Sequence, residues 1–383
     1  MNQHRNTIVD FWRGVVLVTI FVNHVPGNIL ENYTHRNIGF SDGAEAFVFL
    51  SGFAVALVYA GRMGQDAIGV TLRCLRRAAY LYRVHLVLTG TAIALFAAAD
   101  VFGELPTLLE PHGRGPVFHD TSRGITGVLS LGHQLGYFNI LPLYIVLMLW
   151  APLALALVRI HIALAMAVSM LIYAIARSEG WNLPSWPEPG GWYFNPFAWQ
   201  LLFTIGIIAG ARSKKRGIPF HPTAFLASAA IVVTAMVIVT NGLGLWPNLW
   251  ESVGLELDLP KGELGLGRLL HFLALAYVLA HLPLGQCLAS TRPGQQFQRL
   301  GRNSLAVFAV GSLLSALGEV IMTLSEVRYS ASPPLIGMIY TLIGIVVLAI
   351  LARVSEWNSV EFSRQRSRPS AWRWSLSSLQ QRP

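Results

Sequence analysis

The sequence predicts an all-α integral membrane protein, a bundle of about ten transmembrane helices. Of its 383 residues, 54% are hydrophobic and only 12% are charged, whereas roughly 25% of the residues of an average soluble domain are charged. One soluble core does not absorb this much apolar sequence, because such cores stop growing near ~250–300 residues. Glycine (35 residues) and tryptophan (11 residues) are plentiful, as expected where helices pack closely and aromatic rings lie at lipid interfaces.

Ten apolar runs have about the length that crosses a bilayer as a helix. They lie at residues 8–25, 43–60, 79–99, 137–157, 160–177, 196–211, 221–240, 266–285, 304–325 and 333–352. Two are weak, because 43–60 contains Glu45 and 196–211 is short. The first run contains Asp10 and Arg13, and no small-x-small cleavage site follows it. We therefore expect it to be a retained helix and not a cleaved signal peptide.

The basic residues predict the orientation of these helices. If both termini are cytoplasmic, 20 of the 28 Lys and Arg residues fall on the cytoplasmic side, seven on the other side, and Arg13 within the first span. This asymmetry is typical of membrane proteins. The net charge of +9 does not indicate nucleic-acid binding, since the basic residues form no single stripe with interleaved aromatics. Cys74 and Cys287 both fall on the cytoplasmic side, where a structural disulfide is not expected.

The chain divides into a transmembrane domain, residues 1–352, and a basic, disordered cytoplasmic tail, residues 353–383. The longer loops are predicted on the outer side, at residues 26–42, 100–136, 178–195 and 241–265. They are rich in Gly, Pro, Trp and His, as in the run from Trp181 to Pro189. Their tryptophans could face a sugar ring or anchor the loops at the lipid interface, and the sequence leaves both interpretations open.

Arg13 and His24 lie on nearly the same face of the first helix. They are 11 residues apart, which at ~100° per residue is three turns plus ~20°, and ~16 Å along the axis. Asp10 precedes Arg13 at the spacing of an ion pair. Asp10 and Arg13 either reach the cytoplasmic interface or have a task inside the bundle. His24 is either an interfacial histidine or a general base, because imidazole accepts a proton from a hydroxyl near neutral pH.

A general base needs an orienting partner, and the second span offers Glu45 with Asp42 just before it. The outer end of the first helix lies beside the outer start of the second, so contact between Glu45 and His24 is possible. The other interpretation is a buried carboxylate paired elsewhere.

The second and third spans contribute two further signals. Ser51 and Gly52 permit close packing within an apolar helix. Arg73, Arg76, Arg77 and Arg83 follow on the cytoplasmic side. Guanidinium groups suit phosphates, although ordinary positive-inside charge also explains such a cluster.

Together these motifs resemble the membrane acyltransferase-3 family. The resemblance is carried by Asp10-Phe11-Trp12-Arg13-Gly14, by His24, by the FVFLSGF segment at 47–53, by the arginines that follow, and by a late segment at 300–308. Within that superfamily the runs 23–28, 34–37 and 39–42 are most similar to the OpgC branch, which succinylates osmoregulated periplasmic glucans. The resemblance is dense over residues 8–85 and 300–315.

The resemblance implies a transmembrane O-acyltransferase in the bacterial inner membrane, which transfers succinyl or a similar acyl group from acyl-CoA to a periplasmic glucan. It implies catalytic roles for His24 as general base and for Glu45, Arg13 and Asp10. It implies that Arg73, Arg76, Arg77, Arg83 and Ser51 bind the donor. It also implies that Asp42, His35 and Arg268 contact the acceptor or the acyl group. Acyl-CoA is then a substrate, and no permanently bound cofactor or metal is expected. Transfer through a covalent acyl-enzyme stays open beside direct transfer.

Two other functions use the same helices. A transporter or flippase for a glycan or an acyl group would explain buried Asp10, Arg13, Glu45, His271 and Glu319 as a translocation path. It predicts internal repeats and interrupted helices in corresponding positions, which the sequence does not show. A sensor or assembly protein would use the outer loops as its interaction surface.

Overall fold

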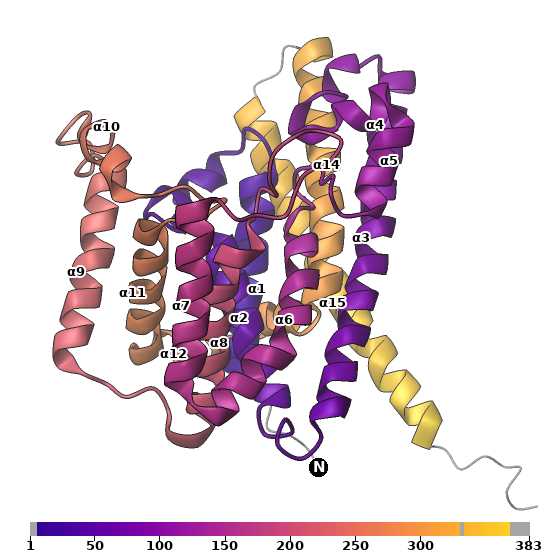
Figure 1. Ribbon diagram of the computed structural model, residues 1–383. Coiled ribbons are helices and arrows are strands. Elements are labelled where there is room, and N and C mark those ends of the chain that lie inside the picture. The colour runs from indigo at the N-terminus through magenta and orange to yellow at the C-terminus, as the bar shows by residue number, and fades with distance from the viewer. Residues whose placement is uncertain (1–5, 330–332, 368–383) are drawn as a thin grey trace, which may run out of the picture.

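The protein is a bundle of upright helices. The computed structural model describes residues 6–329 and 333–367, which are almost entirely helical, and the long helices stand side by side (Figure 1). Ten helices coincide with the ten expected spans: α1 (Thr7–His24), α2 (Gly43–Tyr59), α3 (Ala67–Gly103), α6 (Ile140–Ile160), α7 (Ile162–Glu179), α8 (Pro196–Arg216), α9 (Pro222–Val239), α11 (Leu266–His281), α14 (Ser304–Tyr329) and α15 (Pro333–Ser367). The described residues contain no strand, only an isolated bridge between Pro184 and Gly191. The predicted all-α class is confirmed.

Seven of these helices are long and apolar enough to cross a membrane. Helix α11 and the following α12 (Leu284–Ser290) form a pair bent by 65°, which makes an eighth span if the pair is counted as one. Helix α2 is apolar but has only 17 residues. The chain is therefore a multi-pass membrane protein, and the count of ten spans stays a prediction.

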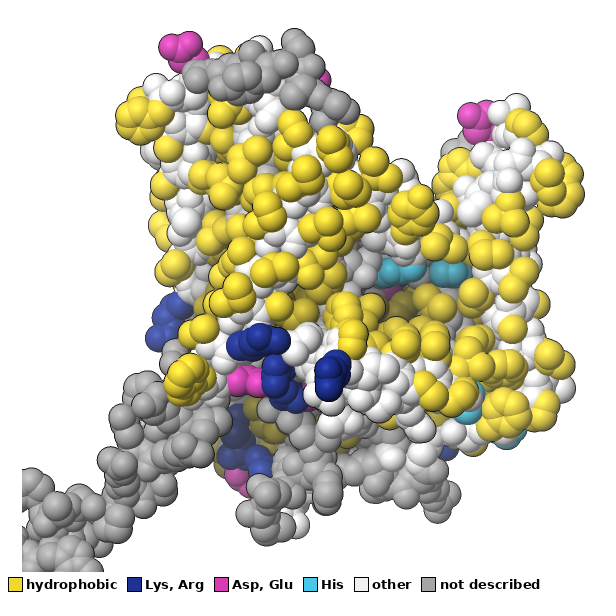
Figure 2. All heavy atoms as spheres, turned by 180° about the vertical axis from the view of Figure 1, so that it is seen from behind, with side chains coloured by type: hydrophobic (Ala, Val, Ile, Leu, Met, Phe, Trp, Pro, Cys, Tyr) yellow, Lys and Arg dark blue, Asp and Glu magenta, His cyan; other side chains and the backbone are white. Residues whose placement is uncertain are grey.

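The two ends of the bundle differ in structure and charge. The start of α1 and the last turns of α15 lie at the same, lower end (Figure 1). Lys and Arg side chains gather toward this end on the face in Figure 2, below a broad hydrophobic surface. The loops of the upper end contain eight short helices: η1 (Ile29–Tyr33), η2 (His35–Asn37), η3 (Pro106–Leu108), η4 (Pro111–Gly113), α4 (Gly115–His119), α5 (Thr121–Leu129), α10 (Leu249–Val253) and η5 (Gly254–Leu257). The side of the membrane on which each terminus lies stays a prediction.

Close glycine contacts hold α2 against α8. A Cβ atom on Gly52 of α2 would lie 2.1 Å from the carbonyl oxygen of Phe203, and one on Gly206 of α8 would lie 2.2 Å from that of Phe49. Such approach of two backbones is open only to the smallest residues. Gly52 of the Ser-Gly pair in the second span therefore serves helix packing, as the composition of this span predicted.

Close contacts at glycines also join α1 to α13 (Arg292–Arg302), a short helix at the lower end. A Cβ atom on Gly14 would lie 1.9 Å from the carbonyl oxygen of Phe297, and one on Gly301 would lie 1.8 Å from that of Asp10. This contact positions the lower half of α1, which carries Asp10 and Arg13.

Helix α15 extends past residue 352, where the disordered tail was expected to begin. Residues 353–367 are helical, and the remainder of that expected tail, residues 368–383, lies outside the described residues. Helix propagation explains the difference, because a membrane-anchored helix adds one hydrogen bond for each further residue it orders.

Both cysteines are free, Cys74 buried and Cys287 exposed.

Candidate active site

A charged cluster joins the start of α2 to α11 at the upper end of the bundle. Asp42 caps α2, accepting a hydrogen bond from the backbone N–H of Ala44 at 2.8 Å, while Glu45 accepts one from the backbone N–H of Asp42 at 2.8 Å. The same carboxylates bind cations: Asp42 lies 2.6 Å from Lys261 and 3.2 Å from Arg268, and Arg268 donates to Glu45 at 2.7 Å. The capping box thus orients both acids toward α11.

The ionisation of Asp42 follows from these contacts. Burial disfavours its charged form, but the charges of Lys261 and Arg268 outweigh burial and hold the pKa of Asp42 well below its usual range. Asp42 is therefore a carboxylate at neutral pH and acts as a fixed anchor for two cations.

Two cavities adjoin this cluster. One, which we call the His24 cavity, has a volume of about 480 Å³ and is lined by His24, Asn23, His112, Tyr137 and apolar side chains of α1, α6 and α14. The other, which we call the outer cavity, has a volume of about 540 Å³. Arg36, Asp42, Tyr193 and Lys261 line both cavities and form their shared wall. Volumes of this size are typical of small-molecule sites.

His24 ends α1 and is half-buried in its cavity, against Tyr137. The two rings meet edge to face, with centroids 5.0 Å apart. The Tyr137 hydroxyl lies 3.3 Å from Nε2 of His112. Burial, with a smaller effect of Glu319, raises the pKa of Tyr137, so its hydroxyl keeps its proton at neutral pH and can donate it in a hydrogen bond.

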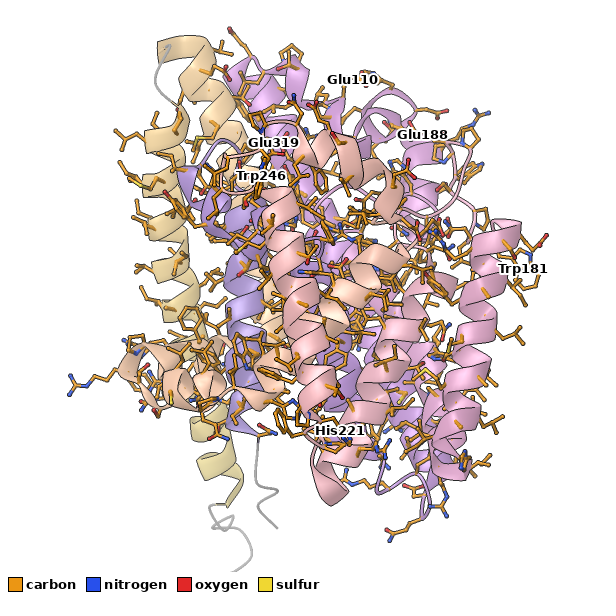
Figure 3. The ribbon with its side chains drawn as sticks, turned by 90° about the vertical axis from the view of Figure 1, so that its left-hand side faces the viewer. Glu110, Trp181, Glu188, His221, Trp246 and Glu319 are labelled. Atoms are coloured by element: carbon orange, nitrogen blue, oxygen red, sulfur yellow. The ribbon has the colours of Figure 1, made fainter. Side chains whose placement is uncertain are left out.

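Buried charges support these rings from behind. Arg114 donates to both oxygens of Glu319, at 3.0 and 2.7 Å, and its guanidinium lies 3.9 Å from the centre of the Phe96 ring. Nε2 of His112 lies 3.9 Å from the Glu319 carboxylate. A bidentate pair of this kind is geometrically specific, so it fixes the loop that carries His112. Glu319 lies in the upper part of the bundle, far from His221 at the lower end (Figure 3).

Two residues of this group have left-handed backbone conformations. His112 has φ of 59° and Tyr137 has φ of 71°, values that are uncommon for residues with a Cβ atom. Gly136 allows the two segments to approach, since a Cβ atom there would lie 2.7 Å from that of His112. Backbone strain of this type is found most often at functional sites.

Of the two interpretations that the sequence left open for Glu45, the structure shows the carboxylate that is buried and paired elsewhere. Both oxygens of Glu45 are taken, one by Arg268 and one by the backbone of Asp42. Among the described residues no hydrogen bond or ion pair joins Glu45 to His24. Desolvation explains this outcome, because a fully buried carboxylate is stabilised far more by a permanent cation than by an imidazole. Asp42 is the acidic residue that lines the His24 cavity.

The other expected substrate residues lie near the outer cavity. Arg268 lines it, but its guanidinium already contacts Glu45 and Asp42. His35 lies in η2 and is not among the side chains that line either cavity. Arg36, the next residue, lines both. His271 is buried and lies 2.9 Å from the hydroxyl of Ser41 through its Nδ1.

Asp10 and Arg13 lie at the lower half of α1. Arg13 donates to the hydroxyl of Ser304, the first residue of α14, at 2.5 Å. Asp10 is buried against α13. The two residues are thus separated from His24 by most of the length of α1, as their spacing predicted.

The four arginines of α3 lie toward its lower end, with Arg76 and Arg83 exposed. Arg73 pairs with Asp66 at 2.9 Å, whereas Arg77 and Arg83 flank the ring of Tyr80. Ser51 is buried inside the bundle, and its hydroxyl has no hydrogen-bond partner among the described residues. No group of three His, Cys, Asp or Glu residues in the described part of the chain is arranged to hold a metal ion.

Sequence reasoning did not identify Tyr137, His112, Arg114, Lys261 and Arg36 as site residues. They come from three outer loops that have no helical period, and only the fold brings these loops together. The arrangement provides an imidazole beside a protonated phenol, in a cavity with cations in its wall. Such a site can remove a proton from a hydroxyl and stabilise an anionic intermediate.

The comparisons with known proteins give one match. No curated protein and no solved structure matches the chain. The model of one family, described as OpgC protein, matches residues 5–360, which include α1, both cavities and every residue of the charged cluster. On this match over nearly its whole length, the chain belongs to the OpgC protein family.

Proposed function

We propose that the protein transfers an acyl group, succinyl in the first place, from acyl-CoA to a hydroxyl group of a periplasmic glucan. Membership of the OpgC family indicates a membrane acyltransferase that acts on glucans. The observation that supports the site is the position of His24, at the upper end of α1 in a cavity with Tyr137, Arg36 and Lys261. This arrangement suits the deprotonation of a hydroxyl beside a bound acyl group.

The chemistry is direct transfer. His24 accepts the proton of the glucan hydroxyl while the hydroxyl oxygen attacks the thioester carbonyl carbon. The carbonyl oxygen becomes negative in the tetrahedral intermediate and accepts a hydrogen bond from Tyr137. The carbon–sulfur bond then breaks, and the thiolate of CoA leaves and takes the proton from His24. An ester and free CoA result, and no further reactant is needed.

The donor enters from the lower, cytoplasmic end in this proposal. Its phosphates bind Arg73, Arg76, Arg77 or Arg83, and Ser51 offers a buried hydroxyl to the arm. Arg13 lies along the same direction, ~16 Å below His24 by helix geometry. The arm thus spans the bundle and delivers the thioester to the His24 cavity.

We assign the free carboxylate of a succinyl group to Arg36. Arg268, the residue suggested by sequence, already contacts Glu45 and Asp42. Arg36 lines both cavities, and its side chain forms no ion pair with any described residue. It therefore brings an uncompensated positive charge to the shared wall.

Mass spectrometry of periplasmic glucans tests the proposal. Host cells that lack the activity receive wild-type protein, His24→Ala or an empty vector, at matched membrane expression. We expect succinylated glucan with wild type and a loss of at least about 100-fold with His24→Ala, because general-base catalysis contributes 10²–10⁴-fold.

His161→Ala is the matched control, since His161 lies between α6 and α7, outside both cavities. It should leave the glucan substituted. Succinylation that persists in His24→Ala would remove His24 from the role of base. Wild type without any substituent on the glucan would instead reject the proposed acceptor.

A further inference from the structure

The outer cavity exposes aromatic rings. Trp250 and Tyr193 keep 40% and 54% of their surface exposed, and both line this cavity together with Phe40. The rings of Phe40 and Trp250 are 6.3 Å apart and inclined by 35°, so they form a continuous apolar wall. Exposed apolar surface inside a cavity is typical of a binding site.

Polar groups alternate with these rings. Asn37, Asn241 and Arg36 line the same cavity. The side-chain oxygen of Asn241 accepts a hydrogen bond from the backbone N–H of Trp250 at 2.8 Å, which fixes the tryptophan on its loop. A wall of this composition suits a molecule with apolar faces and hydroxyl edges, which is the chemistry of a pyranose ring.

The His24 cavity combines polar groups with apolar side chains. Ile20, Ile140 and Phe308 line it from three helices, and these side chains suit the methylene carbons of an acyl group that arrives through the bundle. The two cavities meet at the shared wall of Arg36, Asp42, Tyr193 and Lys261. A ring bound on the outer side of this wall therefore lies next to the space in which His24 acts.

We propose that the outer cavity is the acceptor subsite, in which a glucose unit of the glucan stacks on Trp250 and directs a hydroxyl past the shared wall toward His24. This inference rests on the proposed acyl transfer and adds to it the place of each substrate. The donor's acyl group occupies the His24 cavity and the sugar occupies the outer cavity.

The test compares Trp250→Ala with Trp246→Ala in the full-length protein, purified in detergent and supplied with succinyl-CoA. The acceptor is a glucan preparation from cells that lack the transferase. Trp246, labelled in Figure 3, belongs to the same loop and is 58% exposed. It is not among the residues that line the outer cavity, which makes it a matched control. Release of free CoA is measured against glucan concentration.

We expect Trp250→Ala to raise the acceptor KM about tenfold, as loss of one ring contact predicts. The KM for succinyl-CoA and the melting temperature should stay unchanged, and Trp246→Ala should behave as wild type. Binding of the same glucan to His24→Ala, with and without Trp250→Ala, measures the subsite without turnover. The glucan affinity should be about tenfold lower in the variant that also carries Trp250→Ala.

Unchanged glucan affinity in Trp250→Ala, in either assay, would overturn the assignment of the outer cavity. Equal loss in Trp246→Ala would do the same, because it would point to a general effect on the loop. If the wild-type protein releases no CoA with any glucan but still binds glucan in a way that depends on Trp250, the proposed reaction is rejected and the assignment of the subsite stands.

Discussion

Tyr137 packs its ring against the ring of His24, and its hydroxyl lies 3.3 Å from Nε2 of His112. Tyr137→Phe removes this hydroxyl but keeps the ring that packs on His24. Because the hydroxyl is the donor that we assign to the anionic intermediate, kcat should fall about 100-fold while the donor KM stays unchanged. Steady-state release of CoA at saturating glucan measures both values.

Tyr173→Phe controls for the loss of a buried hydroxyl. Tyr173 donates to the carbonyl of Leu264 at 2.8 Å and lines neither cavity. It should keep wild-type kcat, with at most a modest loss of stability. Equal kcat in Tyr137→Phe and wild type would mean that another group stabilises the intermediate.

The sequence singled out candidate residues on helices more readily than residues of the loops. The spacing of Arg13 and His24 follows from the fixed rise of one helix, and Asp42 was noted because it lies just before the second span. Tyr137 and His112 were not, because their loop has no period and its path depends on the ion pair of Arg114 with Glu319, 205 residues away. The sequence left two interpretations of Glu45 open for the same reason: Arg268, which binds Glu45, comes from a distant helix.

Helix α2 carries the start of the site, and its contact with α8 determines where Asp42 and Glu45 lie. Gly206→Ala places a methyl group 2.2 Å from the carbonyl oxygen of Phe49, so the two helices must separate. We expect a loss of about 1–3 kcal/mol in the free energy of unfolding, the range for overpacked interiors. A lower melting temperature in detergent should report it.

Gly90→Ala is the matched substitution, because no atom lies within 4 Å of the position of its added Cβ. Its melting temperature should equal or exceed that of wild type, since alanine favours the helix. Cys74 is fully buried, so its reaction with a thiol dye during heating follows unfolding in a Cys287→Ser background. If the two alanine variants melt alike, close packing of α2 on α8 does not hold the site in place.

The helices themselves were predictable because lipid requires long apolar runs, and each of the ten runs overlaps a helix. The residues at which the helices begin and end were less predictable. Helix α3 begins at Ala67, twelve residues before its apolar run, because Asp66 caps it there and the arginine-containing segment that follows continues the same hydrogen-bond ladder. The bend between α11 and α12 at Pro283 was not predicted either, because a hydropathy pattern shows the length of an apolar run and not its direction.

Over the whole molecule, the positive charges of the upper end are largely compensated. Arg114 pairs with Glu319, Arg177 with Asp258, Lys261 with Asp42 and Arg268 with Glu45. Lys and Arg side chains meanwhile gather toward the lower end (Figure 2). By the positive-inside rule we therefore expect the lower end to face the cytoplasm. The proposed donor route requires the same orientation, since acyl-CoA is made in the cytoplasm.

Single cysteines at the two ends test this orientation. Trp181 is 56% exposed, and His221 starts the lower end of α9, at the opposite end of the bundle (Figure 3). In a background of Cys74→Ser and Cys287→Ser, a membrane-impermeant maleimide on intact spheroplasts should label Trp181→Cys. It should label His221→Cys only after the membrane is permeabilised. The reverse pattern would place the arginines of α3 outside, and a CoA donor could then no longer reach them from the cytoplasm.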